Sequence, residues 1–280
     1  MQQNRQAPVT GIDSHAHVFE RNLPLTSGRR YAPDYDATLA SYLALLEANG
    51  LSHGVLVQPS FLGTDNRYLL HAVAQAPERL RAVVVVDRTI APQALAQMHA
   101  AGARGVRLNL MGQPLPDLAG PSWQPFFEHL NTLGWHVELH RQLPDIPALL
   151  RPLLARGCKV VVDHLGRGQA LDGLTQPGFH ELLALGREGN VWMKVSGLYR
   201  LGGTHAEQTR FAQQAVALLE QHWAPDRLLW GSDWPHTQHE GQVSFEAELR
   251  RFMELGVAQQ ASILKHNAAV LFDFPLTSGS

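Results

Sequence analysis

Two histidines separated by one residue, His15 and His17, stand near the start of the chain in the stretch GIDSHAHVFE. The apolar segment before them, PVTGID, predicts a short strand, and the two-residue period of a strand points both imidazoles to one side. Neutral imidazoles that project together are a common arrangement of metal ligands. The chain holds 15 histidines, so two ordinary histidines remain the alternative interpretation.

Strand-like and helix-like segments alternate along almost the whole chain. Helical patterns such as ATLASYLALLEANG follow each strand-like run. This alternation predicts a parallel sheet, and eight units in a chain of 280 residues predict a closed (β/α)8 TIM barrel. No glycine-rich dinucleotide turn supports the main alternative, an open doubly wound sheet. The eight strand-like runs are VTGIDSH, HGVLVQ, LRAVVVV, GVRLNL, HVELH, KVVVDH, VWMKVS and RLLWGSD.

Length and composition favour one domain over residues 1–280, with loose ends at 1–8 and 275–280, because no linker divides the chain. A net charge of −2 argues against a nucleic-acid partner. We expect a cytoplasmic protein without a membrane partner, since no apolar leader or spanning run is present. The single cysteine, Cys158, excludes a disulfide framework and a multi-cysteine zinc site. A homodimer is compatible with the sequence.

Polar residues that could do chemistry stand at the predicted strand ends. In a barrel of this kind, the C-terminal ends of the strands meet at one mouth and build the active site. Four histidines and one aspartate fall independently at the ends of strands one, five, six and eight, which predicts a shared site. The residues at the strand ends are His15, His17, Gln58, Ser60, Arg107, Asn109, His140, Asp163, His164, Lys194, Ser196 and Asp233.

These residues make the chain resemble the amidohydrolase superfamily. Its members are (β/α)8 barrels with a His-x-His pair after the first strand, histidines after the fifth and sixth, and an aspartate after the eighth. Within it, four segments resemble the carboxylate-lactone hydrolases typified by 2-pyrone-4,6-dicarboxylate lactonase. The segments are VQPSFLGTDN (57–66), RGVRLN (104–109), DHLGR (163–167) and KVSGLYR (194–200).

The resemblance implies one divalent metal ion, Zn²⁺ or Mn²⁺, or catalysis without a metal. The lactonase that typifies the branch lacks the strand-five histidine and is thought to work without an ion, whereas this chain has a histidine there. No lysine lies near strands four and five to bridge two ions, although Glu138 is a candidate. The ligands implied are His15, His17, His140 and Asp233.

The resemblance also implies roles in catalysis and binding. Asp233 would act as general base, and His164 would polarise the carbonyl or orient the water. The expected reaction is hydrolysis of a small carboxylate-bearing lactone. The alternatives are hydrolysis of a sugar lactone, a metal-dependent decarboxylation, and a barrel that binds ligands without catalysis. The residues implied to contact the substrate are Arg107, Arg167, Arg200, Tyr31 and Ser60.

Overall fold

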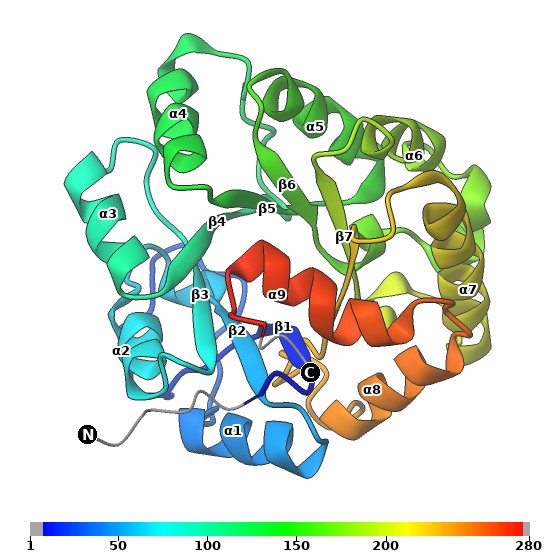
Figure 1. Cartoon of the computed structure of the whole chain (residues 1–280), viewed down its shortest axis with the longest axis horizontal. Helices are drawn as coiled ribbons and strands as arrows, with labels where there is room; N and C mark the ends of the chain where they lie inside the picture. The colour runs from blue at the N-terminus through cyan, green and yellow to red at the C-terminus, as the bar shows by residue number, and fades with distance from the viewer. Residues whose placement is uncertain (1–7, 277–280) are drawn as a thin grey trace.

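The computed structural model describes residues 8–276, and it contains an eight-stranded parallel sheet in the order of the sequence (Figure 1). Each strand pairs with the next, and β1 and β8 lie side by side. The backbone amide of Asp233 donates to the carbonyl of His15 at 2.8 Å, and the amide of His17 donates to Trp234 at 2.8 Å, which joins the two edges. The strands are β1 (Ile12–Ala16), β2 (His53–Val57), β3 (Leu80–Val84), β4 (Ala103–Asn109), β5 (His136–His140), β6 (Lys159–Val162), β7 (Val191–Ser196) and β8 (Leu228–Gly231).

Helices α1 to α8 form the outer ring of the barrel (Figure 1). Their starts carry local signals, such as the capping box of Thr204 and Glu207 before α7 and the Ser244 side chain before α8. The predicted (β/α)8 barrel is therefore confirmed. The helices are α1 (Leu39–Ala48), α2 (Arg67–Gln75), α3 (Pro92–Ala100), α4 (Gln124–Thr132), α5 (Ile146–Ala155), α6 (Phe179–Gly186), α7 (His205–His222), α8 (Phe245–Glu254) and α9 (Asn267–Phe272).

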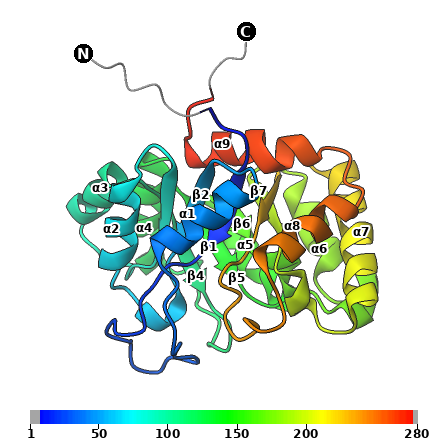
Figure 2. The same cartoon turned by 90° about the horizontal axis from the view of Figure 1, so that it is seen from below.

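The end of the barrel at which the strands begin is closed by α9. Phe272 of α9 is fully buried, and its ring lies 5.2 Å from the ring of His136, the first residue of β5. Ile12, Val55 and Val161 belong to the same apolar cluster. Figure 2 shows α9 across this end of the barrel. We call this region the closed end.

Long loops occupy the opposite end, which we call the open end. The loop that joins β1 to α1 (residues 17–38) and the loop that joins β8 to α8 (residues 232–244) both project there (Figure 2). Most of the residues expected to be loose at the termini lie outside the described part of the chain. None of the helices in residues 8–276 is long and apolar enough to cross a membrane.

Candidate active site

A cavity of about 360 Å³ lies at the open end. It is lined by every residue to which the resemblance assigns a role except His15, which is fully buried beside it. The strand ends therefore converge as expected. The lining residues predicted from the sequence are His17, Tyr31, Ser60, Arg107, His140, His164, Arg167, Arg200 and Asp233.

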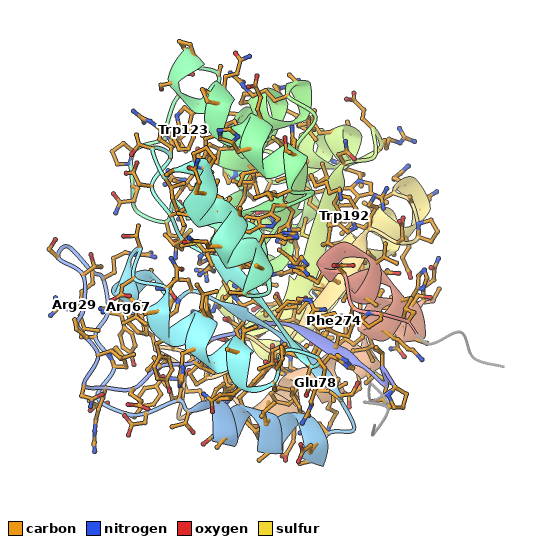
Figure 3. All side chains as sticks on the ribbon, turned by 60° about the vertical axis from the view of Figure 1, so that its left-hand side comes forward. Arg29, Arg67, Glu78, Trp123, Trp192 and Phe274 are labelled. Carbon is orange, nitrogen blue, oxygen red and sulfur yellow. The ribbon has the colours of Figure 1, made fainter. Side chains whose placement is uncertain are left out.

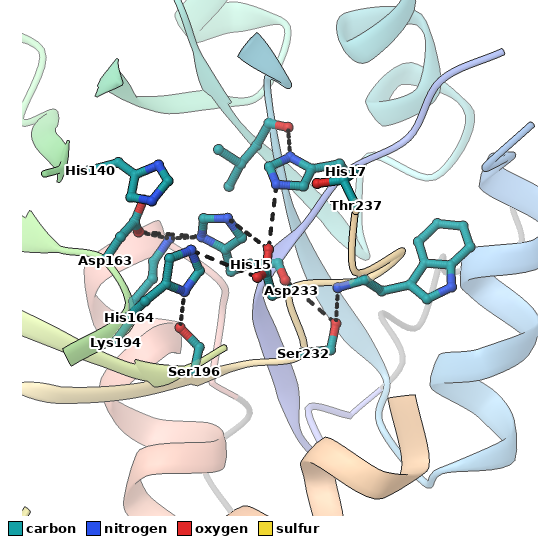
Figure 4. Close-up of polar contacts among 12 residues, drawn as sticks. His15, His17, His140, Asp163, His164, Lys194, Ser196, Ser232, Asp233 and Thr237 are labelled. Atoms are coloured by element: carbon teal, nitrogen blue, oxygen red, sulfur yellow. Dashed lines mark hydrogen bonds and ion pairs between the residues drawn. The ribbon is translucent and has the colours of Figure 1, made fainter. Parts of the chain in front are cut away.

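His15 and His17 lie at the end of β1, with their ring centroids 4.9 Å apart (Figure 4). The Nδ1 atom of His17 lies 2.7 Å from the carbonyl oxygen of Val57, so Nδ1 carries the proton and Nε2 keeps its lone pair. This Nε2 lies 3.7 Å from Oδ1 of Asp233. The buried Nε2 of His15 has no hydrogen-bond partner among residues 8–276 and lies 3.8 Å from the same oxygen.

Three ligand atoms, one each from His15, His17 and Asp233, lie within 4.8 Å of one another. For His17, the lone pair of Nε2 faces a carboxylate oxygen of Asp233, so two acceptors point toward one another. Imidazole and carboxylate are ligands that suit zinc and manganese. The residues in this group therefore fit a divalent ion.

His140 lies outside that compact group. Its Nδ1 atom is 3.2 Å from Nη2 of Arg107, which can only donate, so the neutral ring carries its proton on Nε2. Burial, followed by the charge of Arg107, holds the pKa of His140 well below its usual value and keeps the ring neutral. In this arrangement His140 offers an N–H donor at the cavity.

Asp233 is buried in the loop after β8, and its two oxygens have different surroundings. The Tyr199 hydroxyl donates to Oδ2 at 2.7 Å, and the Nε atom of Arg200 donates to the same oxygen at 2.5 Å. Burial alone would raise the pKa of Asp233, but Arg200 and the nearby histidines more than offset this and hold that pKa well below its usual value. Asp233 is therefore ionised, and Oδ1 is the oxygen that faces the histidine pair.

His164 and Arg167 reach the cavity from an unusual turn after β6. Residues 164–167 all have positive φ, between 49° and 66°, a left-handed conformation that non-glycine residues rarely adopt. The Nδ1 atom of His164 lies 2.8 Å from the Ser196 hydroxyl, and its Nε2 lies 3.9 Å from Oδ2 of Asp233. Burial keeps the pKa of His164 well below its usual value, so the ring is neutral.

A group of buried charges, of which Figure 4 draws Lys194 and Asp163, supports the site from within the barrel. Lys194 forms an ion pair with Glu138 and places Nζ 2.9 Å from Nδ1 of His15. Arg107 donates from Nη2 to Oδ2 of Asp163 at 2.9 Å. Two buried carboxylates and two buried cations thus balance one another, which fixes the side chains around His15.

Two predicted substrate contacts come from surface segments. Ser60 begins a short 3₁₀ turn, Ser60–Leu62, at the edge of the cavity. Tyr31 lines the cavity from the first loop, and its hydroxyl donates to Oε1 of Glu240 at 2.7 Å. Tyr35 donates to the same oxygen at 2.8 Å. We call Tyr31, Tyr35 and Glu240 the loop clasp, because it joins the β1–α1 loop to the β8–α8 loop.

Sequence reasoning missed several residues of the site. Tyr199 stands beside Arg200 inside the segment KVSGLYR, so its neighbour offered a signal that could have found it. Three further residues lie in loops without hydrophobic periodicity: Arg30, His239 and Glu240. No sequence pattern indicates that the first loop and the last loop, about 200 residues apart, come together. Only the folded chain brings Arg30 and His239 to the same cavity.

Comparisons with known proteins agree with this architecture. A family model described as Amidohydrolase matches residues 12–274. A 2-pyrone-4,6-dicarboxylate hydrolase of Comamonas testosteroni is 34% identical over 82% of this chain and 78% of that protein. A 4-sulfomuconolactone hydrolase of Rhizobium radiobacter is 32% identical over 83% of this chain and 80% of that protein. The solved structure of a candidate 2-pyrone-4,6-dicarboxylic acid hydrolase from Pseudomonas putida has a TM-score of 0.92 and 55% identity, covering 97% of this chain and 100% of that one.

Proposed function

The chain belongs to the amidohydrolase family, and from this membership we propose that it hydrolyses a small lactone that carries carboxylate groups. The substrate to test first is 2-pyrone-4,6-dicarboxylate, because the relative from Comamonas testosteroni is named as a hydrolase of this compound. The observation that carries the proposal is the ionised Asp233 at a cavity lined by four arginines. The name of a second relative, a hydrolase of another anionic lactone, supports the same reaction class.

The cavity suits a small planar acid. A guanidinium group can hold a carboxylate with two parallel hydrogen bonds, and arginine provides this fork where lysine does not. Arg167 presents such a group to the cavity beside the histidines. A volume of about 360 Å³ accommodates a single six-membered ring with its substituents.

The chain's own residues can move the protons that the reaction requires. Oδ1 of Asp233 accepts a proton from water as the water oxygen attacks the lactone carbonyl. The N–H groups of His140 and His164 donate to the carbonyl oxygen as it becomes negative. The bond between the carbonyl carbon and the ring oxygen then breaks, and Asp233 returns its proton to that ring oxygen. The product is the ring-opened acid.

We propose that one zinc or manganese ion serves this site, held by His15, His17 and Asp233. When bound, the ion lowers the pKa of a water molecule and polarises the carbonyl. His140 would be the fourth ligand if its ring were released from Arg107. Catalysis without an ion would use the same Asp233 and the same donors, so the two versions differ only in their need for metal.

The experiment that tests the reaction class is product analysis by mass spectrometry after incubation with 2-pyrone-4,6-dicarboxylate. Lactone hydrolysis adds one water to the substrate, whereas decarboxylation removes one carbon dioxide. We expect the hydrated product alone. Release of carbon dioxide would replace the proposal with the decarboxylase alternative, and turnover of sugar lactones alone would replace the substrate class.

A further inference from the structure

The arginines around the cavity fall into two pairs that differ in their partners. Arg107 is bonded to Asp163, with Nη2 and Oδ2 2.9 Å apart, and Arg200 is bonded to Asp233. Both carboxylates are fully or almost fully buried. The charges of Arg107 and Arg200 are therefore already balanced by the protein before any substrate enters.

The other two arginines, Arg30 and Arg167, form no ion pair with any carboxylate of residues 8–276. Arg30 donates from Nη2 to the side-chain oxygen of Asn109 at 3.2 Å, which is a neutral partner. The Nε atom of Arg167 is buried and has no hydrogen-bond partner among the described residues. Two guanidinium groups at the cavity, exposed Arg30 and partly buried Arg167, thus have no carboxylate partner among the described residues.

Repulsion between the arginines supports this interpretation. Burial, then the charges of Arg107 and Arg200, lower the pKa of Arg30. Burial, then Arg200, lower the pKa of Arg167. Like charges in a partly desolvated cavity raise each other's energy, and an entering anion relieves that cost. A ligand with two acid groups would relieve it at both arginines.

The loop clasp holds Arg30 in place. Arg30 comes from the β1–α1 loop, and the next residue, Tyr31, is bonded to Glu240 across the open end. Tyr35 makes the second bond to Glu240. Asn109, at the end of β4, holds one nitrogen of the guanidinium, so the remaining donors stay available to the cavity.

We propose that Arg30 determines specificity for the second acid group of the substrate, with Arg167 binding the first. Arg107 and Arg200 act instead as positioning residues for Asp163 and Asp233. This inference rests on the proposed function for the class of substrate, a small anionic ring. It assigns the discrimination between a diacid and a monoacid to one residue of a surface loop.

Binding of two unreactive rings tests the assignment. Isophthalate carries two carboxylates in the same 1,3 arrangement as 2-pyrone-4,6-dicarboxylate, and benzoate carries one. Calorimetry on the wild type should show that isophthalate binds about tenfold to a hundredfold more tightly than benzoate. One additional hydrogen-bonded charge pair changes the affinity by about this factor. In Arg30→Met the ratio of the two affinities should fall to near one, and Arg30→Lys should recover part of it.

Arg29→Met is the matched control. Arg29 is the neighbouring arginine and is also exposed. Among residues 8–276 its side chain donates only to the carbonyl of Thr26, at 3.3 Å, and it lies at the outer edge of the molecule in Figure 3. This variant should keep the wild-type ratio. An unchanged ratio in Arg30→Met, an equal loss in both variants, or no discrimination by the wild type would each overturn the assignment.

The binding measurement is independent of turnover, so the two proposals can fail separately. If Arg30→Met abolishes discrimination but the wild type opens no lactone, the assignment of Arg30 stands and the proposed function fails. If the wild type opens the lactone and Arg30→Met keeps full discrimination, the proposed function stands and the assignment fails.

Discussion

The two ends of the barrel are built from different kinds of side chain. At the closed end, α9 packs Phe272 against an apolar cluster of strand residues. At the open end, histidines, carboxylates and arginines from many strand ends surround one cavity, and His164 and Asp233 adopt strained backbone conformations. The difference indicates that the closed end stabilises the fold. At the open end, buried charges and strained backbone conformations cost folding free energy, and they position the groups that do the chemistry.

The largest expected effect is at the open end. Asp233→Asn removes the base but keeps the shape of the side chain, so kcat/KM for 2-pyrone-4,6-dicarboxylate should fall about 10²- to 10⁴-fold. Steady-state kinetics measures the loss, and circular dichroism checks that the variant is folded. A variant that keeps near-normal turnover would remove Asp233 from the mechanism.

At the closed end, we expect a large effect on stability and little effect on activity. Phe272→Ala should lower the free energy of unfolding by about 3–5 kcal/mol, because it leaves a cavity in the apolar cluster. Val270→Ala, on the same helix at a position 61% exposed, should change little. Urea denaturation measures both, and kcat/KM of the folded fraction should stay within about threefold of wild type. A selective loss of activity without a loss of stability would contradict the division between the two ends.

The pH dependence of stability offers a smaller test of the closed end. His53, the first residue of β2, lies beside Phe274, and burial, then Arg79 and Arg81, lower its pKa to about 4. Because the unfolded histidine binds its proton near pH 6.5, the stabilisation is complete above that value. It is lost as the pH falls from about 6.5 to 4.

His53→Gln removes this titration. Between pH 6.5 and 4, the wild type should lose about 2 kcal/mol more unfolding free energy than the variant, as measured by urea denaturation at each pH. Parallel pH profiles for the two proteins would show that His53 does not titrate differently on folding.

The smallest effect concerns the loop clasp. Tyr31→Phe removes one hydrogen bond to Glu240 and should raise KM about threefold to tenfold with little change in kcat, since a bond of this kind contributes on the order of 1 kcal/mol. Thr132→Val is the control, because the Thr132 hydroxyl donates to the Glu128 carbonyl at 2.9 Å within α4, outside the cavity. Equal KM values for the two variants would show that the clasp does not order the first loop.

The two ends were also unequally predictable from the sequence. Strand periodicity, with the rule that the C-terminal strand ends meet at one mouth, was enough to predict that His17, His164 and Asp233 share a site. Pairing between charges was not predictable, because it depends on side-chain geometry across strands. The resemblance implied substrate contact for Arg107, Arg167 and Arg200. In the structure, Arg107 and Arg200 are paired with buried carboxylates and Arg167 is not. No sequence pattern indicated Arg30, because the position of its loop depends on the hydrogen bond between Tyr31 and Glu240, which lie far apart in the chain.

Lactone hydrolysis at the open end is best tested by the rate at which the protein opens 2-pyrone-4,6-dicarboxylate, followed by the absorbance of the ring. The protein should first be stripped with a chelator and then supplied with Zn²⁺ or Mn²⁺. We expect loss of the ring absorbance with the ion present. A fast rate in the stripped sample would show that the residues act without the ion. An unchanged ring in both samples would contradict the claim that the open end is a site of lactone hydrolysis.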